Sequence, residues 1–197
     1  LKLKTGRLIV AMYSGSGLCF CIYSDNDGAS WSYSESWIEI ANWGFEPSIA
    51  LDSDHNLVMS IRPSGSKYAA AFAKSVDDGE NWELMHTDRL TSSNNQSFLL
   101  YDDSIQAHLI SHTTSNGWVR TKFRISISYD DCYTFPLTYA PFLDSKYVGY
   151  TQLIKWVDGI YLLLMEYNDT FVSINANEQL GIQLINAKEV FNNVNRT

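Results

Sequence analysis

The sequence predicts an all-β fold, a β-propeller built from blades of four antiparallel strands. Two observations support this prediction. Short segments rich in β-branched and aromatic residues recur along the chain, bounded by the Gly, Asp, Asn and Ser residues that favour tight turns. An eight-residue turn pattern also begins at Ser24, Ser75 and Ser128, at intervals of 51 and 53 residues. One propeller blade takes about 40 to 50 residues, so the 197 residues correspond to about four blades.

Hydrophobic periodicity identifies the clearest strands. These are the segments 7–13, 56–62, 105–111 and 160–166. Near the C-terminal end, the segment 177–192 mixes residues that favour helices with residues that favour strands. The run from Leu180 to Ile185 favours a strand, and we expect one there.

The repeated pattern has the features of a self-contained turn. Its copies are SDNDGASW (24–31), SVDDGENW (75–82) and SYDDCYTF (128–135). A strand ends at the Ser, an Asp or Asn side chain accepts hydrogen bonds from turn amides, and Gly supplies a positive φ. The closing Trp or Phe is expected to pack under the loop. An EF-hand is excluded, because no copy has the spaced oxygen ligands and the terminal Glu.

Composition narrows the function classes. The net charge of -8 argues against a nucleic-acid partner, which would need basic surface. Apolar runs are too short to span a bilayer, and the first residues lack the features of a signal peptide, so we expect a soluble chain. The missing initiator Met predicts that the chain starts inside a larger protein.

Cysteine and histidine spacing fits no metal site. Cys19, Cys21 and Cys132 are expected to be small buried hydrophobes, with the first two on one face of a strand. Three glycosylation acceptor patterns begin at Asn95, Asn168 and Asn195. A chain this rich in Asn, Ser and Thr contains two or three of them by chance, so they do not decide for secretion.

The repeated turn resembles the Asp box, S-x-D-x-G-x-[ST]-[WF], of the sialidase (neuraminidase) and BNR-repeat propellers. The second copy fits best, with Asn81 at the Ser/Thr position. Asn26 stands where Asp is usual in the first copy, and Cys132 replaces Gly in the third. In the family these boxes lie on the propeller rim away from the active site. They therefore indicate the fold, and function has to come from other residues.

Four residues outside the boxes extend the resemblance to sialidases. Glu46 in FEPSIAL and Arg62 at the end of LVMSIR are similar to a family segment in which Glu opens one strand and Arg ends the next. QSFLLY (96–101) resembles a Gln-Gly-Ser stretch without its Gly. Arg120 resembles a further active-site Arg, and GYTQL, which contains Tyr150, resembles the segment that carries the nucleophilic Tyr.

The resemblance implies hydrolysis of terminal α-linked sialic acids by a retaining mechanism. Arg62 and Arg120 would be two of three arginines that bind the sialic acid carboxylate, because guanidinium groups bind carboxylates bidentately. That carboxylate repels an anionic nucleophile, and the family uses a Tyr instead of a second carboxylate. Tyr150 would attack the anomeric carbon, and Glu46 would withdraw its phenolic proton. No cofactor is expected.

Each assignment has a structural alternative. Tyr150 would otherwise be a half-buried aromatic residue with its hydroxyl in solvent, and Arg62 a solvated strand end. Glu46 would otherwise be a solvated turn carboxylate, although the following Pro47 predicts an extended conformation for it. Arg124 competes with Arg120 for the same role. The spacing of 30 residues to the nucleophile favours Arg120.

Two parts of the family pattern have no counterpart in this sequence. These are an initial Phe-Arg-Ile-Pro segment with the first arginine of the triad, and an Asp that serves as general acid/base. We therefore expect residues 1–197 to form the C-terminal four blades of a six-bladed sialidase-type propeller, inactive alone. The missing N-terminal blades would lie on the same or another chain. The expected partner is a sialylated glycan, and the expected location is extracellular or at the cell surface.

Two other functions stay open at the level of sequence. A non-catalytic glycan-binding propeller, such as a lectin-like or receptor-binding module, would keep the arginines without the chemistry. A trans-sialidase uses the same core residues. Endo-acting cleavage of a sialic acid polymer typically dispenses with the Tyr, so Tyr150 counts against it.

Overall fold

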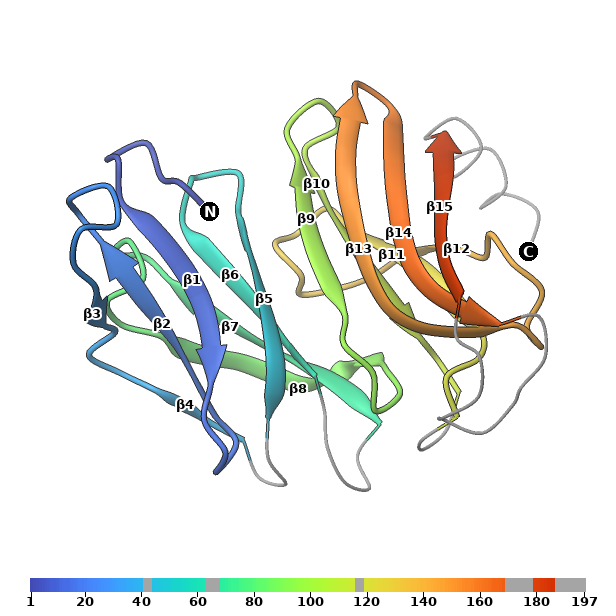
Figure 1. Ribbon diagram of the computed structural model, residues 1–197, viewed down its shortest axis with the longest axis horizontal. Helices are drawn as coiled ribbons and strands as arrows, with labels where there is room; N and C mark the ends of the chain where they lie inside the picture. Colours follow the sequence, from blue (N-terminus) through green and yellow to red (C-terminus); the bar gives the residue numbers. More distant parts are fainter. Residues whose placement is uncertain (41–43, 63–67, 116–118, 169–178, 187–197) are drawn as a thin grey trace.

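A computed structural model describes residues 1–40, 44–62, 68–115, 119–168 and 179–186. Within these ranges the chain forms fifteen strands in four antiparallel sheets, which stand one beside the next in chain order (Figure 1). This confirms the predicted all-β architecture. No helix in these ranges is long and apolar enough to cross a lipid bilayer.

Each sheet is built from consecutive strands. The first sheet contains β1 (Leu8–Tyr13), β2 (Leu18–Ser24), β3 (Ser32–Tyr33) and β4 (Ile38–Glu39). The second contains β5 (Phe45–Leu51), β6 (Leu57–Arg62), β7 (Ala69–Ser75) and β8 (Glu83–Thr91). The third contains β9 (Phe98–Asp102), β10 (Ala107–Thr113), β11 (Phe123–Ser128) and β12 (Leu137–Tyr139). The fourth contains β13 (Tyr147–Val157), β14 (Ile160–Asn168) and β15 (Gln179–Asn186).

The strands expected from hydrophobic periodicity are present, with one shift. Strand β10 begins two residues later than predicted, because Ile105 and Gln106 belong to the preceding turn and Gln106 has a φ of 49°. The strand expected at 180–185 is confirmed as β15.

Three hydrophobic clusters join the four sheets pairwise. The cluster between the first and second sheets includes Ile9, Cys19, Cys21 and Met59. The cluster between the second and third includes Val58, Phe72, Leu99, Ile110 and Cys132. The cluster between the third and fourth includes Leu109, Phe123, Ile125, Leu153 and Leu163. Alternate residues of β6 and β10 therefore enter different clusters, as strands buried on both faces require. All three cysteines are buried, as predicted.

The Asp boxes form the expected turns. In the three copies, the Oγ of Ser24, Ser75 or Ser128 accepts a hydrogen bond from the backbone N–H at the Gly position, at 2.9, 3.0 and 2.8 Å. Cys132 takes the Gly position of the third copy with a φ of 68°. The closing aromatic residue differs from expectation in the first copy only: Trp31 is 44% exposed, whereas Trp82 is buried.

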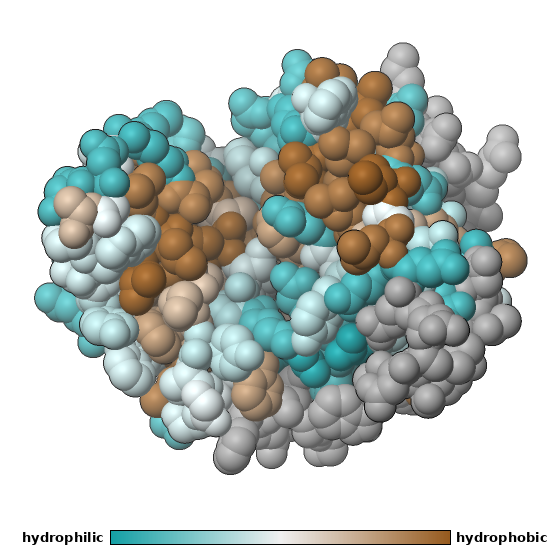
Figure 2. All heavy atoms as spheres, in the orientation of Figure 1, coloured by the Kyte–Doolittle hydropathy of each residue, from teal (hydrophilic) through white to brown (hydrophobic). Residues whose placement is uncertain are grey.

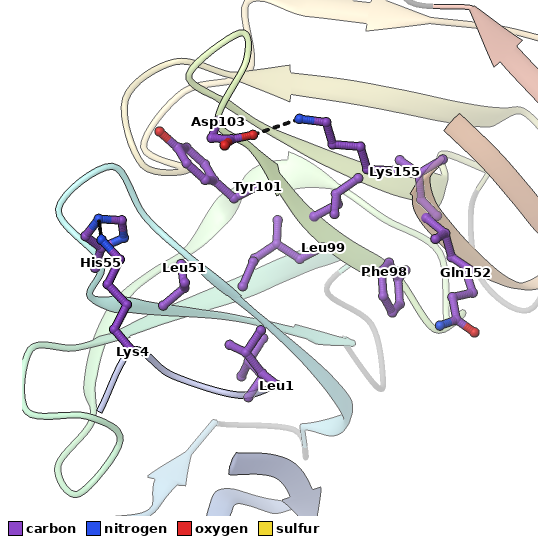
Figure 3. Close-up of a pocket in the computed structure, with 15 residues that line it drawn as sticks. Leu1, Lys4, Leu51, His55, Phe98, Leu99, Tyr101, Asp103, Gln152 and Lys155 are labelled. Carbon is purple, nitrogen blue, oxygen red and sulfur yellow. Dashed lines mark hydrogen bonds and ion pairs between the residues drawn. The ribbon is translucent and has the colours of Figure 1, made fainter. Parts of the chain in front are cut away.

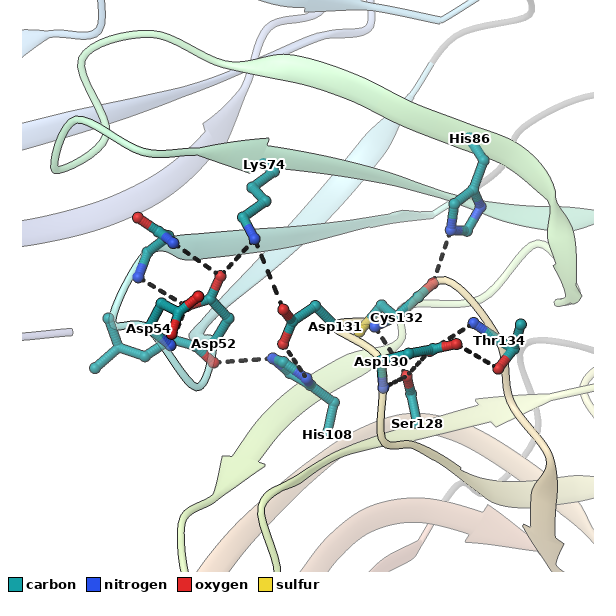
Figure 4. A network of polar contacts seen from close by, with 12 residues as sticks. Asp52, Asp54, Lys74, His86, His108, Ser128, Asp130, Asp131, Cys132 and Thr134 are labelled. Atoms are coloured by element: carbon teal, nitrogen blue, oxygen red, sulfur yellow. Dashed lines mark hydrogen bonds and ion pairs between the residues drawn. The ribbon is translucent and has the colours of Figure 1, made fainter.

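The boxes share one end of the sheets with the hairpins at residues 52–56, 102–106 and 157–160. We call this end the box rim. A polar network connects neighbouring blades there: the Lys74 ammonium pairs with Asp52 at 2.7 Å and with Asp131 of the third box at 3.7 Å (Figure 4). The buried carboxylate of Asp52 thus has a cationic partner.

Candidate active site

The four residues singled out from the sequence converge at the end of the sheets opposite the box rim, which we call the site rim. Glu46 lies near the start of β5, Arg62 ends β6 and Tyr150 lies in the first half of β13. Arg120 lies in the segment before β11. Three sheets therefore contribute to one cluster, and two of its members, Glu46 and Tyr150, are 104 residues apart in the chain.

A β-bulge aims Glu46. Phe45 pairs with Arg62 and Ser48 with Ser60, so Glu46 and Pro47 together lie opposite the single residue Ile61. Glu46 has a φ of 43°, and the extended conformation predicted from Pro47 is wrong at this position. The reason is the bulge, which adds a residue to one strand and redirects its side chain. Pro47 tolerates this, because it has no N–H to contribute to the ladder.

A second bulge presents Tyr150. Val148 pairs with Tyr167 and Thr151 with Met165, so Gly149 and Tyr150 share one position opposite Glu166. The Tyr150 backbone N–H donates to Glu166 Oε2 at 3.1 Å. A Cβ at Gly149 would lie 2.6 Å from that same oxygen. A Cβ at Gly149 would therefore displace the Glu166 carboxylate from this position.

The phenol, the carboxylate and one guanidinium are in direct contact. The Tyr150 hydroxyl donates to Glu46 Oε1 at 2.5 Å. Arg62 Nη1 donates to Glu46 Oε2 at 2.5 Å and to the Tyr150 hydroxyl oxygen at 3.2 Å. The side chains of Arg62 and Glu46 are only 10% and 19% exposed, so these contacts are largely protected from solvent screening.

Arg120, and not Arg124, lies beside Tyr150. The Arg120 Cζ is 4.9 Å from the centre of the Tyr150 ring, and its Nη1 donates to the Tyr147 hydroxyl at 3.4 Å. Arg124 instead pairs with Asp144 at 2.8 Å. The positive charge over the ring face is the arrangement of a cation–π contact.

Burial raises the pKa of Tyr150, and the hydrogen bond to Glu46 and the charge of Glu46 raise it further. The charges of Arg62 and Arg120 oppose this shift. The phenol is therefore protonated at neutral pH, with its proton directed at a carboxylate oxygen that can accept it. Loss of that proton would leave a Tyr150 phenolate beside the guanidinium groups of Arg62 and Arg120.

In the described part of the chain, each of the two arginines also has one buried side-chain nitrogen without a hydrogen-bond partner. Arg62 Nε and Arg120 Nε are buried and make no hydrogen bond within the described residues. A buried donor without a partner is costly in a folded protein. A planar carboxylate fits the geometry of a guanidinium, and it would approach through the outer Nη groups because both Nε atoms are buried.

Two hollows adjoin the cluster, and Tyr150 and Gln96 line both. One, of about 340 Å³, also contacts Met12, Tyr13 and Glu46. The other, of about 350 Å³, also contacts Gln152 and Glu166. Tyr150 is thus accessible to a small molecule from either side.

A larger, mostly apolar pocket of about 580 Å³ lies between the inner strands β5, β9 and β13. Figure 3 shows Leu51, Leu99 and Phe98 along its walls, with the Lys155–Asp103 ion pair at one end. None of the four site residues lines it. This pocket is therefore distinct from the cluster around Tyr150.

Sequence reasoning missed Asn95. Its glycosylation pattern suggests an exposed side chain, yet Asn95 is 1% exposed and its amide contacts the backbone beside Tyr150. The only signal was its position next to Gln96, in the stretch that resembles a family motif. Within the described residues, no group of three or more His, Cys, Asp or Glu side chains is arranged to hold a metal ion.

A family model described as a BNR repeat-like domain matches residues 1–163. The chain belongs to this BNR repeat-like family. No curated protein matches its sequence.

Solved structures place this BNR repeat-like chain among the sialidase propellers by fold. It is similar to the NanB sialidase from Streptococcus pneumoniae, with a TM-score of 0.77, 21% identity and coverage of 96% of this chain and 30% of that one. It is also similar to a leech intramolecular trans-sialidase, with a TM-score of 0.76, 21% identity and coverage of 100% of this chain and 31% of that one. A third similar structure is a protein of unknown function from Dyadobacter fermentans, with a TM-score of 0.71, 17% identity and coverage of 94% of this chain and 52% of that one. The chain thus spans about a third of the length of the two enzymes.

Proposed function

We propose that the chain is part of an exo-α-sialidase-type glycoside hydrolase that removes terminal sialic acids from glycoconjugates with retention of configuration. The observation that carries this proposal is the contact of the Tyr150 phenol with Glu46 and Arg62, beneath Arg120. A tyrosine paired with a carboxylate between two arginines suits a substrate that carries its own carboxylate at the reacting carbon.

In the proposed reaction, Arg62 and Arg120 bind the sialic acid carboxylate through their guanidinium groups. Glu46 accepts the phenolic proton as the Tyr150 oxygen forms a bond to the anomeric carbon. The glycosidic bond breaks, and an acid outside this cluster protonates the departing oxygen. Water then hydrolyses the glycosyl-tyrosine. Net retention follows from two displacements at one carbon.

Further blades would complete the ring. The outer face of the fourth sheet carries Leu180, Ile182 and Leu184, which are 89%, 72% and 62% exposed. The outer face of the first sheet carries Val10 and Met12, which are 41% and 38% exposed. Figure 2 shows hydrophobic side chains over both end sheets with a hollow between them. Exposed apolar faces are typical of interfaces, and we assign these two to contacts with N-terminal blades on the same or another chain.

The proposal is tested with a fluorogenic sialoside on the isolated 197-residue chain and on the full-length protein. The isolated chain should be inactive, and the full-length protein active. Tyr150→Phe should abolish turnover, and Glu46→Gln should lower kcat about 10²- to 10⁴-fold. Mass spectrometry should detect a sialyl adduct on the peptide that contains Tyr150. Full activity of the Tyr150→Phe protein would reject the mechanism.

A non-catalytic sialic acid-binding propeller is the alternative that the same experiment separates. It would bind the sialoside through Arg62 and Arg120 without turnover, and Tyr150→Phe would leave the affinity unchanged. Transfer of sialic acid to a lactose-type acceptor in place of water would identify a trans-sialidase. An extracellular or cell-surface location belongs to the proposal, because sialylated glycans are displayed there.

A further inference from the structure

Asn95 contacts the backbone that carries Tyr150. It lies between β8 and β9, with its side chain directed at β13 of the neighbouring sheet. Its Nδ2 donates to the carbonyl oxygens of Gly149 at 2.8 Å and Val148 at 3.3 Å. These are the two residues before Tyr150, and they lie where the β13–β14 register shifts. The bulge is therefore held by a side chain from another blade.

The segment that carries Asn95 is itself tied to the third sheet. The Ser93 backbone N–H donates to the Thr113 carbonyl at the end of β10 at 2.8 Å, and the Asn95 N–H donates to the Ser93 carbonyl at 2.6 Å. The Ser93 hydroxyl also donates to the Thr113 carbonyl at 3.2 Å. The backbone at Asn95 is thus anchored by hydrogen bonds, as a residue that positions another one requires.

Other contacts hold the far side of Tyr150. Its N–H donates to Glu166 Oε2. The next residue, Thr151, shares a hydrogen bond of 2.7 Å between its hydroxyl and that of Ser111. On the near side, the Val148 N–H donates to the Arg120 carbonyl at 2.8 Å. Asn95 supplies the side-chain contact to the carbonyl groups of Gly149 and Val148.

We propose that Asn95 is a positioning residue that fixes the Gly149–Tyr150 bulge and so keeps the Tyr150 phenol on Glu46. The catalytic consequence rests on the proposed function, in which Tyr150 is the nucleophile. Asn95 acts through the backbone and does not touch the substrate.

The chemistry of the amide explains why Asn is required. An NH₂ group can donate to two carbonyl oxygens at once, whereas a carboxylate of the same shape can only accept. Asn95→Asp would therefore set a negative charge against two carbonyl oxygens. Protonation of the introduced carboxyl group would restore one donor, so the defect of this variant should diminish as the pH falls through the pKa of that group.

The test compares Asn95→Asp with Asn94→Asp, a control that places the same charge at an adjacent residue that is also 1% exposed. Amide hydrogen exchange of Tyr150 is measured by NMR, together with the resonances of tyrosines labelled at Cζ and assigned with Tyr150→Phe. Tyr150 exchange should rise about tenfold in Asn95→Asp and not in Asn94→Asp, since a hydrogen bond contributes about a factor of ten to protection. The Tyr161 resonance reports whether the rest of the fold is intact.

The pH series supplies the second readout. Lowering the pH should partly restore protection of Tyr150 in Asn95→Asp alone. If Asn95→Asp does not fold, Asn95→Ala removes the same donors without a charge and should show the exchange increase without the pH recovery. Unchanged exchange and an unshifted Tyr150 resonance in the folded Asn95 variant would overturn the proposal.

These measurements need no substrate, so they separate this inference from the proposed function. In the active full-length protein, Asn95→Asp should lower kcat about tenfold and leave KM within about twofold, since substrate binding stays with the arginines. An inactive wild type with intact exchange effects would reject the proposed function and keep the positioning role. If the wild type is active and Asn95→Asp changes neither exchange nor kcat, the proposed function stands and the positioning role is rejected.

Discussion

Two tyrosine–carboxylate pairs, one on each rim, have the same geometry and different surroundings. On the site rim, the Tyr150 hydroxyl donates to Glu46 at 2.5 Å. On the box rim, the Tyr161 hydroxyl donates to Asp102 at 2.5 Å. Each pair joins two blades. The short contact alone therefore does not distinguish a candidate catalytic pair from a structural one.

The surroundings do distinguish them. Tyr161 and Asp102 are fully buried, and Asp102 also accepts hydrogen bonds from Ser104 and pairs with Lys155. Burial acts to raise the pKa of Asp102, but the hydrogen bonds from Lys155, Tyr161 and Ser104 outweigh it, and the pKa lies below its usual range. Tyr150 and Glu46, in contrast, adjoin a hollow and lie beside two arginines. The adjoining hollow and the two neighbouring guanidinium groups, more than the short distance, distinguish the candidate site.

The largest expected difference between the rims is in stability. Asp102→Ala leaves Tyr161 and the Ser104 N–H without their acceptor and should lower the free energy of unfolding by about 3 kcal/mol. Glu46→Ala should cost less, about 1 kcal/mol, because Tyr150 lines the adjacent hollow and water there can replace the lost acceptor. Urea unfolding of both variants measures this. Equal losses would show that the site pair is also structural.

Much of the fold was predictable because its signals are local. The Asp boxes carry their own hydrogen bonds: Asp77 Oδ1, for example, accepts from the Asn81 N–H four residues on. The spacing of such boxes indicated the blades. Strand β10 was misplaced by two residues because a positive φ at Gln106 has no signature in a non-glycine residue.

The members of the candidate site were selected from the sequence, whereas the arrangement that brings them together was not predictable from it. Glu46, Arg62, Arg120 and Tyr150 were selected by resemblance, and the structure brings them together. The two bulges that aim Glu46 and Tyr150 depend on register between strands, which one sequence does not specify. Asn95 was missed for the same reason, since its role comes from a contact with Gly149, 54 positions away in the chain.

Alkaline pH should affect the two tyrosines differently. Burial and the hydrogen bond to Asp102 raise the pKa of Tyr161 far above its usual value. In the unfolded chain the Tyr161 hydroxyl ionises at about pH 10, whereas in the folded protein it stays protonated at that pH. The stability that Tyr161 contributes is therefore fully present below about pH 10 and is lost as the pH rises toward the pKa of the folded state. From about pH 9 to about pH 11, wild type should lose about 1 kcal/mol more stability than Tyr161→Phe. Tyr150→Phe, at a more accessible position, should differ less from wild type, and unfolding curves across this pH range measure both differences.

The smallest effect on stability is expected from removing a cation on the site rim. Arg120→Met leaves no buried carboxylate without its partner, because the recorded contacts of the Arg120 side chain are to Tyr147 and the Tyr150 ring. Its free energy of unfolding should stay within about 0.5 kcal/mol of wild type. Lys155→Met is the matched control on the box rim, where the ammonium pairs with fully buried Asp102 at 2.7 Å, and it should cost at least about 1 kcal/mol. If Arg120→Met were as destabilising as Lys155→Met, Arg120 would serve the fold, and its position beside Tyr150 would no longer argue for a bound carboxylate.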